Sequence, residues 1–233
     1  VHRTWDHTSL VVGRWLLAFS FDSNFSIEHV YGHHLNVATA NDSASAPRGR
    51  TVYEHIVRST IGGNRSAWRI ERKRLERRKL PVYSIQNKFI RGLLMSGTLL
   101  ILTFLIADWA GLAFFVLAGC WGKALLEITN YMEHYGLVRS NKSPVAPRHS
   151  WNTNKKITSW SMFNLSRHSH HHAQGHLPFH KLKPYPEAPM MLSGYLATLC
   201  ITLIPPVWFK LMQPKLEVWD KQFATDEERL LLK

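Results

Sequence analysis

The sequence predicts an all-helical, membrane-bound protein, and three observations lead to this fold class. Long uncharged apolar runs follow one another in the middle of the chain, no segment shows the alternating pattern of a strand, and many of the 14 histidines recur at helical spacing. A backbone that crosses a bilayer must satisfy its hydrogen bonds internally, which favours helices. We therefore expect residues 1–233 to form a single integral-membrane helical bundle.

The 233 residues carry 29 lysines and arginines against 16 acidic residues, and the excess gathers in "RSAWRIERKRLERRK", residues 65–79. This stretch has no Gly or Pro and Pro81 follows it, so it predicts a helix that ends near Lys79 or Leu80. Its charge is typical of a solvated helix face, a helix at the membrane surface, or a docking surface for an acidic protein.

The two cysteines form no CxxC pair, which argues against a thiolate metal site.

A membrane hairpin is predicted over residues 89–130. Residues 92–107 are uncharged between Arg91 and Asp108, and a second apolar run begins at Trp109, interrupted only by Lys123 and Glu127. Crossing the hydrocarbon takes roughly 20 residues. We expect the chain to cross twice and to turn near Asp108, in preference to a hairpin buried in a soluble core.

A further apolar segment spans residues 188–209 without a charge. Gly194 interrupts it and Pro205 and Pro206 break its end, so it either spans the membrane or lies partly sunk at the interface, and we favour the interface. Residues 38–50 and 140–156 are rich in turn-forming residues and predict connections.

The histidines form groups at defined spacing. "RHSHHH" places His168, His171 and His172 within one narrow arc of a helix at about 100° per residue, while His170 points to the opposite side. "IEHVYGHH" places His29 and His33 on one face, with His34 one step round. "NYMEHYG" adds His134 after the second apolar run, and His2 stands near the start.

This pattern predicts a metal site. Neutral imidazole binds iron, zinc, copper or nickel. A single zinc needs about four ligands, so seven or eight converging histidines indicate two metal ions. Glu28 and Glu133 each precede a candidate ligand, and we expect them to orient imidazoles or to offset the metal charge. The remaining histidines are expected to be solvent-exposed or hydrogen-bonded side chains: His7, His55, His149, His176 and His180.

The motifs resemble those of the membrane-bound, non-haem di-iron alkane hydroxylases (alkane 1-monooxygenases), within the wider superfamily of fatty-acyl desaturases and hydroxylases. "EHVYGHH" matches the pattern EHxxGHH, "NYMEHYGL" matches NYxEHYG, and "LSRHSHHH" matches LxRHSxHH. The opening "VHR" resembles only the end of the HExxHK or HExxHR motif, so His2 would be its second histidine. We expect the first histidine of that motif and the earlier membrane helices to lie upstream of Val1.

The resemblance implies oxygen-dependent terminal hydroxylation of medium-chain n-alkanes to 1-alkanols, with no catalytic side chain beyond the metal ligands. It implies two iron ions, O2 as co-substrate, and electrons from rubredoxin and rubredoxin reductase. It places the protein in the bacterial inner membrane as a multi-pass protein in contact with lipid, with the metal on the cytoplasmic side. The implied iron ligands are His2, His29, His33, His34, His134, His168, His171 and His172.

Rubredoxins are typically acidic, and the basic helix is the candidate docking surface, with Arg69, Arg72, Lys73 and Arg77 as its proposed contacts.

Three alternative functions stay open. An aryl-methyl monooxygenase of the xylene or cymene type would share the motifs, and an acyl desaturase would share them less closely. A membrane metal-binding or transport protein is less well supported, because transport predicts ionisable residues inside the spans. Nucleic-acid binding is not expected, because no reader motif is present.

Overall fold

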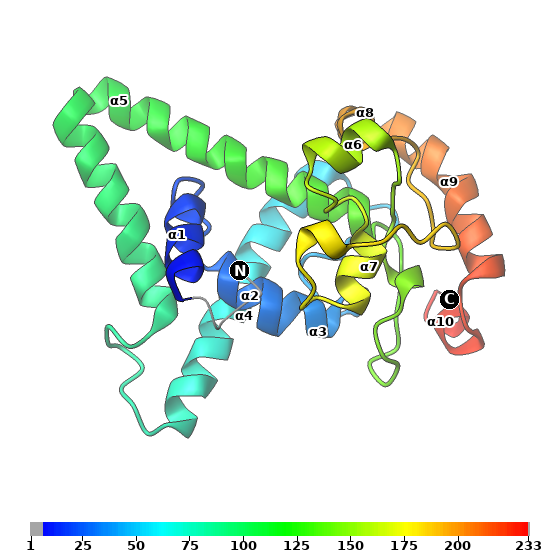
Figure 1. Cartoon of the computed structure of the whole chain (residues 1–233), viewed down its shortest axis with the longest axis horizontal. Coiled ribbons are helices and arrows are strands. Elements are labelled where there is room, and N and C mark those ends of the chain that lie inside the picture. Colours follow the sequence, from blue (N-terminus) through cyan, green and yellow to red (C-terminus); the bar gives the residue numbers. More distant parts are fainter. Residues whose placement is uncertain (1–6, 233) are drawn as a thin grey trace. The chain divides into compact units, whose positions relative to one another are not determined.

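The computed structural model describes residues 7–232, and it consists of helices joined by loops (Figure 1). In that range the β-type pairing is a single isolated bridge between Asn152 and Met190, so the all-helical prediction is confirmed. By packing, the chain divides into two compact units. In the described part of the chain, unit 1 contains residues 7–33 and 60–126, and unit 2 contains residues 34–59 and 127–232.

Unit 1 is built around helix α5, Lys88–His134, which is 47 residues long and contains a sharp break (Figure 1). Ala107 leaves the helical conformation, and Asp108 adopts φ 52° and ψ −158°. The Asp108 carboxylate then accepts a hydrogen bond from the amide of Trp109, at 2.9 Å, at the start of the second arm. The break lies where the sequence analysis placed the turn of the hairpin.

Both arms of α5 expose large apolar side chains, and none of the most apolar window is buried. Within residues 7–232 this is the helix whose length and composition suffice to cross a membrane. Lys123 interrupts the second arm, and its ammonium group lies 3.1 Å from the carboxylate of Asp22. Glu127 accepts hydrogen bonds from Ser59 and Asn130. Of the two charges that interrupt the apolar run, Lys123 is thus paired with an opposite charge and Glu127 is hydrogen-bonded to neutral donors.

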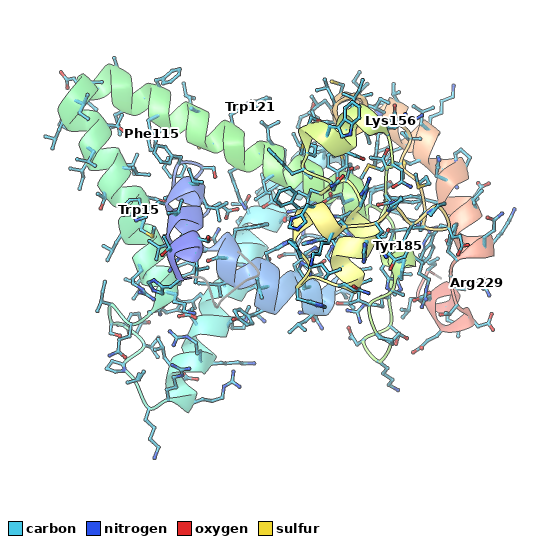
Figure 2. All side chains as sticks on the ribbon, viewed as in Figure 1. Trp15, Phe115, Trp121, Lys156, Tyr185 and Arg229 are labelled. Carbon is cyan, nitrogen blue, oxygen red and sulfur yellow. The ribbon has the colours of Figure 1, made fainter. Side chains whose placement is uncertain are left out.

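Helix α1, His7–Ala18, packs against both arms. The guanidinium group of Arg14 donates to the carbonyl of Lys88, at 2.6 Å, and Ser96 of the first arm donates to the carbonyl of Ala18, at 3.3 Å. The ring of Phe115 in the second arm meets Phe19 and Phe21 edge-on, at centroid distances of 6.0 and 5.6 Å. Figure 2 shows the side chain of Phe115 on this arm.

Helix α4, Val52–Arg77, ends close to the predicted position, and Lys79 beyond it adopts a positive φ. Glu71 joins the end of α4 to the start of α5, because its carboxylate accepts from the amide of Lys88, at 2.8 Å, and from the guanidinium group of Arg74. Burial alone would raise the pKa of Glu71, but the hydrogen bonds from Arg74 and Lys88 lower it below its ordinary value. The inner face of the basic helix is therefore structural.

Unit 2 surrounds the last turns of α5. Tyr131, Tyr135 and Trp208 form an aromatic cluster with ring centroids 5.1 to 5.4 Å apart, and Trp151 and Trp219 are fully buried. This apolar packing fixes the end of α5, which carries His134. The other elements of unit 2 are α3 (His34–Asn36), η2 (Pro147–His149), α6 (Lys156–Ser161), α7 (His168–Ala173), η3 (Phe179–Lys181), α8 (Tyr195–Thr202), α9 (Pro205–Gln222) and α10 (Asp226–Leu230).

The apolar segment 188–209 is divided between two helices. Helix α8 has 8 residues, and α9 begins at Pro205 after non-helical backbone at Ile204. Eight helical residues extend about 12 Å, well short of the ~30 Å hydrocarbon core. This segment therefore does not form one spanning helix, and its place at the interface stays a prediction.

Candidate metal centre

Three buried histidines of unit 2 direct their ring nitrogens at one another. His134 ends α5, while His168 and His172 lie one turn apart on α7. The Nε2 atom of His168 is 3.1 Å from Nε2 of His134 and 2.9 Å from Nε2 of His172. Helix α7 thus brings His168 and His172 together with His134.

A hydrogen-bond acceptor orients the ring of His134, and a carboxylate lies beside the ring of His168. The Nδ1 atom of His134 is 3.2 Å from the carbonyl oxygen of His149, which can only accept, so Nδ1 carries the proton. The Nδ1 atom of His168 lies 3.2 Å from the carboxylate of Glu133. A neutral imidazole that is protonated on Nδ1 presents its lone pair on Nε2, where a metal can bind.

Glu133 is itself held in place by Tyr195, a residue that the sequence analysis missed. The buried Tyr195 hydroxyl donates to the Glu133 carboxylate. Tyr195 lies at the start of α8 and outside every histidine motif, so no spacing rule connects it to Glu133. The Glu133 carboxylate lies beside His168, and its role in orienting that ring stays a prediction.

A second histidine pair lies next to this group. The Nε2 atoms of His34 and His171 are 3.1 Å apart, and the rings of His34 and His172 have centroids 4.6 Å apart. Gly175 lies against the His34 ring, since a Cβ atom there would be 3.1 Å from it. Five histidines of unit 2 therefore form one continuous group.

The donor set fits a metal ion. Two nitrogens that bind one ion at roughly 2.1 Å and subtend about 90° are about 3.0 Å apart. The nitrogen pairs in unit 2 are separated by 2.9 to 3.1 Å. Neutral imidazoles suit iron, copper, zinc or nickel, so the geometry admits iron without selecting it.

The two motif histidines of unit 1, His29 and His33, lie on a π-helical turn, which the sequence analysis did not predict. His29–His33 form a π-helical turn between α2 (Phe25–Glu28) and α3, where the sequence analysis assumed ordinary helical register. The rings of His29 and His33 still share a face, stacked with centroids 5.2 Å apart. Phe25 stacks on the other side of His29, at 4.3 Å. π-Helical turns of this kind are frequent at functional sites.

Gly32 gives the π-helical turn room for Glu28. A Cβ atom at Gly32 would lie 2.6 Å from the Glu28 carboxylate and 3.1 Å from the Ser66 hydroxyl. The glycine of "EHVYGHH" therefore lets the carboxylate pack directly against the backbone of the turn.

The remaining histidines have varied environments, and His2 lies outside the described residues. His170 is buried and faces Tyr185, and its Nδ1 accepts from the amide of Lys183, at 2.6 Å. Fully buried histidines are His55 and His149, and exposed ones are His7, His176 and His180. The four candidate docking residues are all exposed: Arg69, Arg72, Lys73 and Arg77.

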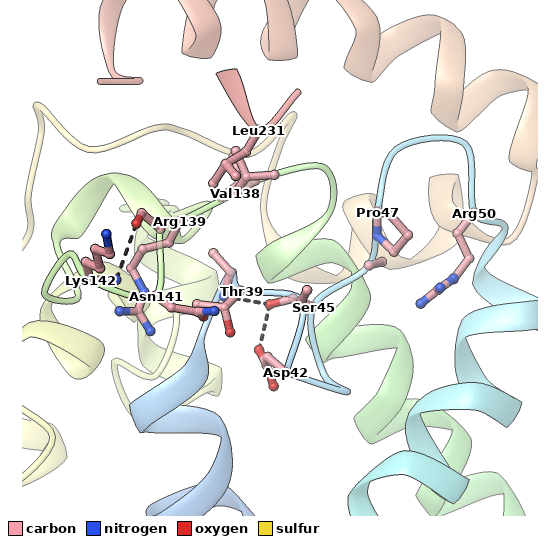
Figure 3. A pocket seen from close by; sticks show the side chains of 15 residues that line it. Thr39, Asp42, Ser45, Pro47, Arg50, Val138, Arg139, Asn141, Lys142 and Leu231 are labelled. Carbon is pink, nitrogen blue, oxygen red and sulfur yellow. Dashed lines mark hydrogen bonds between the residues drawn. The ribbon is translucent and has the colours of Figure 1, made fainter. Parts of the chain in front are cut away.

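A cavity of about 630 Å³ in unit 2 is formed by other residues (Figure 3). The connection 38–50 and the segment 137–142 line most of it. Ser45 donates to Asp42, at 2.6 Å, and the buried guanidinium group of Arg139 donates to the carbonyls of Leu35 and Val37. No histidine is among its lining residues, so this cavity is not the candidate metal centre.

Residues 1–208 match the family model described as Fatty acid desaturase. The chain is 38% identical over 223 residues to alkane 1-monooxygenase 1 of Pseudomonas aeruginosa, and the match covers 94% of this chain and 58% of that protein. It is 38% identical over 198 residues to alkane 1-monooxygenase of Acinetobacter baylyi, with 83% and 48% covered. The xylene/toluene monooxygenase hydroxylase component XylM of Pseudomonas putida is 35% identical over 220 residues, with 93% and 58% covered.

The chain thus spans roughly half the length of these curated relatives. The matched range includes the histidine groups of both units and the whole of α5. From the family match and its coverage, the chain belongs to the fatty acid desaturase family.

Proposed function

We propose that this chain forms the histidine-rich part of an oxygen-dependent hydroxylase that converts medium-chain n-alkanes to 1-alkanols. The observation that carries the proposal is the group of five histidines in unit 2, whose Nε2 atoms lie 2.9 to 3.1 Å apart in pairs. The relatives named alkane 1-monooxygenase support this substrate class.

We assign two iron ions to the histidines of the motifs. Iron bound there would supply the activation of dioxygen that oxygen insertion into a C–H bond requires. Imidazole ligands suit this chemistry, because thiolates would themselves be oxidised. The proposed ligands are His2, His29, His33, His34, His134, His168, His171 and His172.

The surrounding residues hold protons and exclude water. The His149 carbonyl accepts from the Nδ1 atom of His134, which leaves its Nε2 atom available to a metal, and the Glu133 carboxylate lies 3.2 Å from the Nδ1 atom of His168. The rings of His134, His168 and His172 are buried, so water has little access to them. We assign Glu28 a similar supporting role on the π-helical turn.

The electron donor is proposed to be rubredoxin, reduced by its reductase. Arg69, Lys73 and Arg77 recur at intervals of four residues on α4, so their exposed side chains lie along one face. A positive face of this kind suits an acidic carrier.

The hairpin of α5 is proposed to cross the bacterial inner membrane, with the histidines on the cytoplasmic side.

An aryl-methyl substrate is the second candidate, supported by the 35% identity to XylM. Product analysis of the full-length protein, reduced by rubredoxin and supplied with octane or p-xylene at equal concentration, separates the two. We expect 1-octanol as the main product, with a higher kcat/KM for octane. Methylbenzyl alcohol as the main product would assign the protein to the aryl-methyl class, and no hydroxylated product from either would contradict the hydroxylase proposal.

A further inference from the structure

The loop after α5 connects a candidate metal ligand to the C-terminal segment of the chain. The carbonyl of His149 accepts from Nδ1 of His134, at 3.2 Å. The same residue turns its side chain the opposite way, and its Nε2 lies 2.7 Å from the carboxylate of Glu228 on α10. His149 is fully buried and so is Glu228, so this connection is closed to water.

The proton positions along this connection follow from the partners. The amide of Ala146 donates to Nδ1 of His149, at 3.0 Å, so the neutral ring carries its proton on Nε2. That N–H donates to Glu228, which can only accept while it is ionised. The backbone of His149 is therefore held by its own side chain, with its carbonyl directed at His134.

Besides its hydrogen bond with His149, the Glu228 carboxylate accepts further hydrogen bonds. Arg148 donates to both of its oxygens, at 3.0 Å each, and the amide of Thr225 donates to one of them, at 2.9 Å. Trp219 on α9 holds the same loop through the carbonyl of Arg148, at 2.7 Å. A buried carboxylate with four hydrogen bonds is a rigid support for the loop.

We propose that Glu228 is a positioning residue for the metal centre and acts on His134 through His149. This inference rests on the proposed function, since it takes His134 as an iron ligand. Without the Glu228 carboxylate, the His149 carbonyl moves away from Nδ1 of His134. The His134 ring then loses its fixed tautomer and orientation, and iron binding weakens. Loss of an outer partner of a ligating histidine typically lowers metal affinity ~10–100-fold.

The test compares Glu228→Gln with Asp226→Asn in the full-length protein. Both changes remove one negative charge from α10. Asp226 is exposed, and its carboxylate forms an ion pair with Arg229 of the same helix. Iron(II) affinity is measured by titration of metal-free protein, and ⁵⁷Fe Mössbauer spectra report the environment of each bound iron. Helix content and thermal unfolding are followed in parallel.

We expect Glu228→Gln to bind iron about tenfold or more weakly and to change the spectrum of one iron. Asp226→Asn is expected to match wild type. A wild-type affinity and spectrum in Glu228→Gln would overturn the proposal, and so would equal losses in both variants. If Glu228→Gln does not fold, Glu228→Asp replaces it under the same criteria, because it keeps the charge but shortens the reach to His149.

A double-mutant cycle tests whether the effect passes through His149. His149→Phe keeps the size of the ring and removes both of its hydrogen bonds. If Glu228 acts through His149, the losses of affinity are not additive, and the double variant resembles His149→Phe alone. Additive losses would overturn this route. A wild-type protein that binds no iron would instead contradict the proposed function, which keeps the two failures distinct.

Discussion

Gly32 lies in the π-helical turn with the Glu28 carboxylate and the Ser66 hydroxyl close to its Cα hydrogens. We predict that Gly32→Ala destabilises the protein by at most about 1 kcal/mol, because the added methyl group overlaps only the end of the flexible Glu28 side chain, which can move. The carboxylate must then move, and iron content is expected to fall with it. Thermal unfolding and iron analysis of the purified variant measure the two effects.

Gly97→Ala is the matched control for this change. Gly97 is an interior residue of α5, and a Cβ atom there meets nothing within 4 Å. Alanine in a helix interior is favoured over glycine by about 0.5–1 kcal/mol, so stability should stay level or rise. An equal loss of stability in both variants would show that crowding against Glu28 is not the cause.

The lowered pKa of Glu228 makes the free energy of unfolding depend on pH. Burial alone would raise its pKa, but hydrogen bonds from Arg148, Thr225 and His149 lower it from 4.5 to about 2. The folded state thus binds this proton less readily than the unfolded state, so the carboxylate stabilises the fold above pH 4.5. That stabilisation is lost as the pH falls from 4.5 towards 2.

We therefore expect Glu228→Gln to be less stable than wild type at pH 7, by roughly 1–3 kcal/mol. The difference should shrink as the pH falls below 4.5, because Glu228 in the unfolded wild-type chain then takes up a proton while the folded state stays ionised. Denaturant unfolding at a series of pH values measures this. A difference that stays constant down to pH 2.5 would mean that the ionised carboxylate is not the source of the stabilisation.

At the scale of elements, helix α4 has two distinct faces. Its inner face holds Glu71 and Arg74, which fasten the start of α5. Its outer face exposes Arg69, Arg72, Lys73 and Arg77. The basic composition of this helix therefore serves both structure and, in our proposal, partner binding.

We predict that the double variant Arg69→Glu/Lys73→Glu slows electron transfer from reduced rubredoxin about tenfold or more at low salt, with a smaller salt dependence. Lys210→Glu/Lys221→Glu reverses the same charge at exposed positions of α9 and serves as control. Stopped-flow oxidation of rubredoxin at two ionic strengths gives both quantities. Equal rates in the α4 variant and wild type would exclude this surface.

The sequence predicted elements wherever the signal was local. The uncharged run of residues 92–107, which ends at Asp108, indicated the break in α5. The spacing of His168, His171 and His172 indicated α7. The π-helical turn at His29–His33 was not predictable, since five residues do not distinguish it from an α-helix. Tyr195 and the connection from Glu228 to His149 were also missed, because both join residues far apart in the sequence.

At the scale of the whole molecule, the α5 hairpin predicts a definite topology. If both arms cross the membrane, Asp108 faces the periplasm, while Tyr83 in the loop before α5 faces the cytoplasm. We expect a membrane-impermeant maleimide to label Asp108→Cys in intact spheroplasts and Tyr83→Cys only in inverted vesicles. The native Cys120 and Cys200 are replaced by serine in this background.

Cys120 provides an internal check in the unmodified chain. It is exposed on the second arm of α5. If that arm is in contact with lipid, the thiol resists the impermeant reagent from both sides and reacts after denaturation. Labelling of Cys120 in intact membranes, or of Asp108→Cys and Tyr83→Cys from the same side, would contradict the hairpin.

The fold class followed from composition, because long uncharged runs and the absence of strand patterning leave few other solutions. The division into two units and the cavity of Figure 3 did not follow, since they depend on packing between distant segments. The histidine motifs indicated a metal-binding protein before any contact was known. Which atoms orient those histidines became visible only in the folded chain.

Elemental analysis for iron and zinc decides whether these histidines hold two iron ions, as we propose. The full-length protein is compared with His168→Ala, His171→Ala and His172→Ala, and with His176→Ala as the exposed control. We expect about two irons per chain in wild type and in the control, with loss in each of the three variants. One zinc per chain, or a metal content indifferent to His168, His171 and His172, would contradict it.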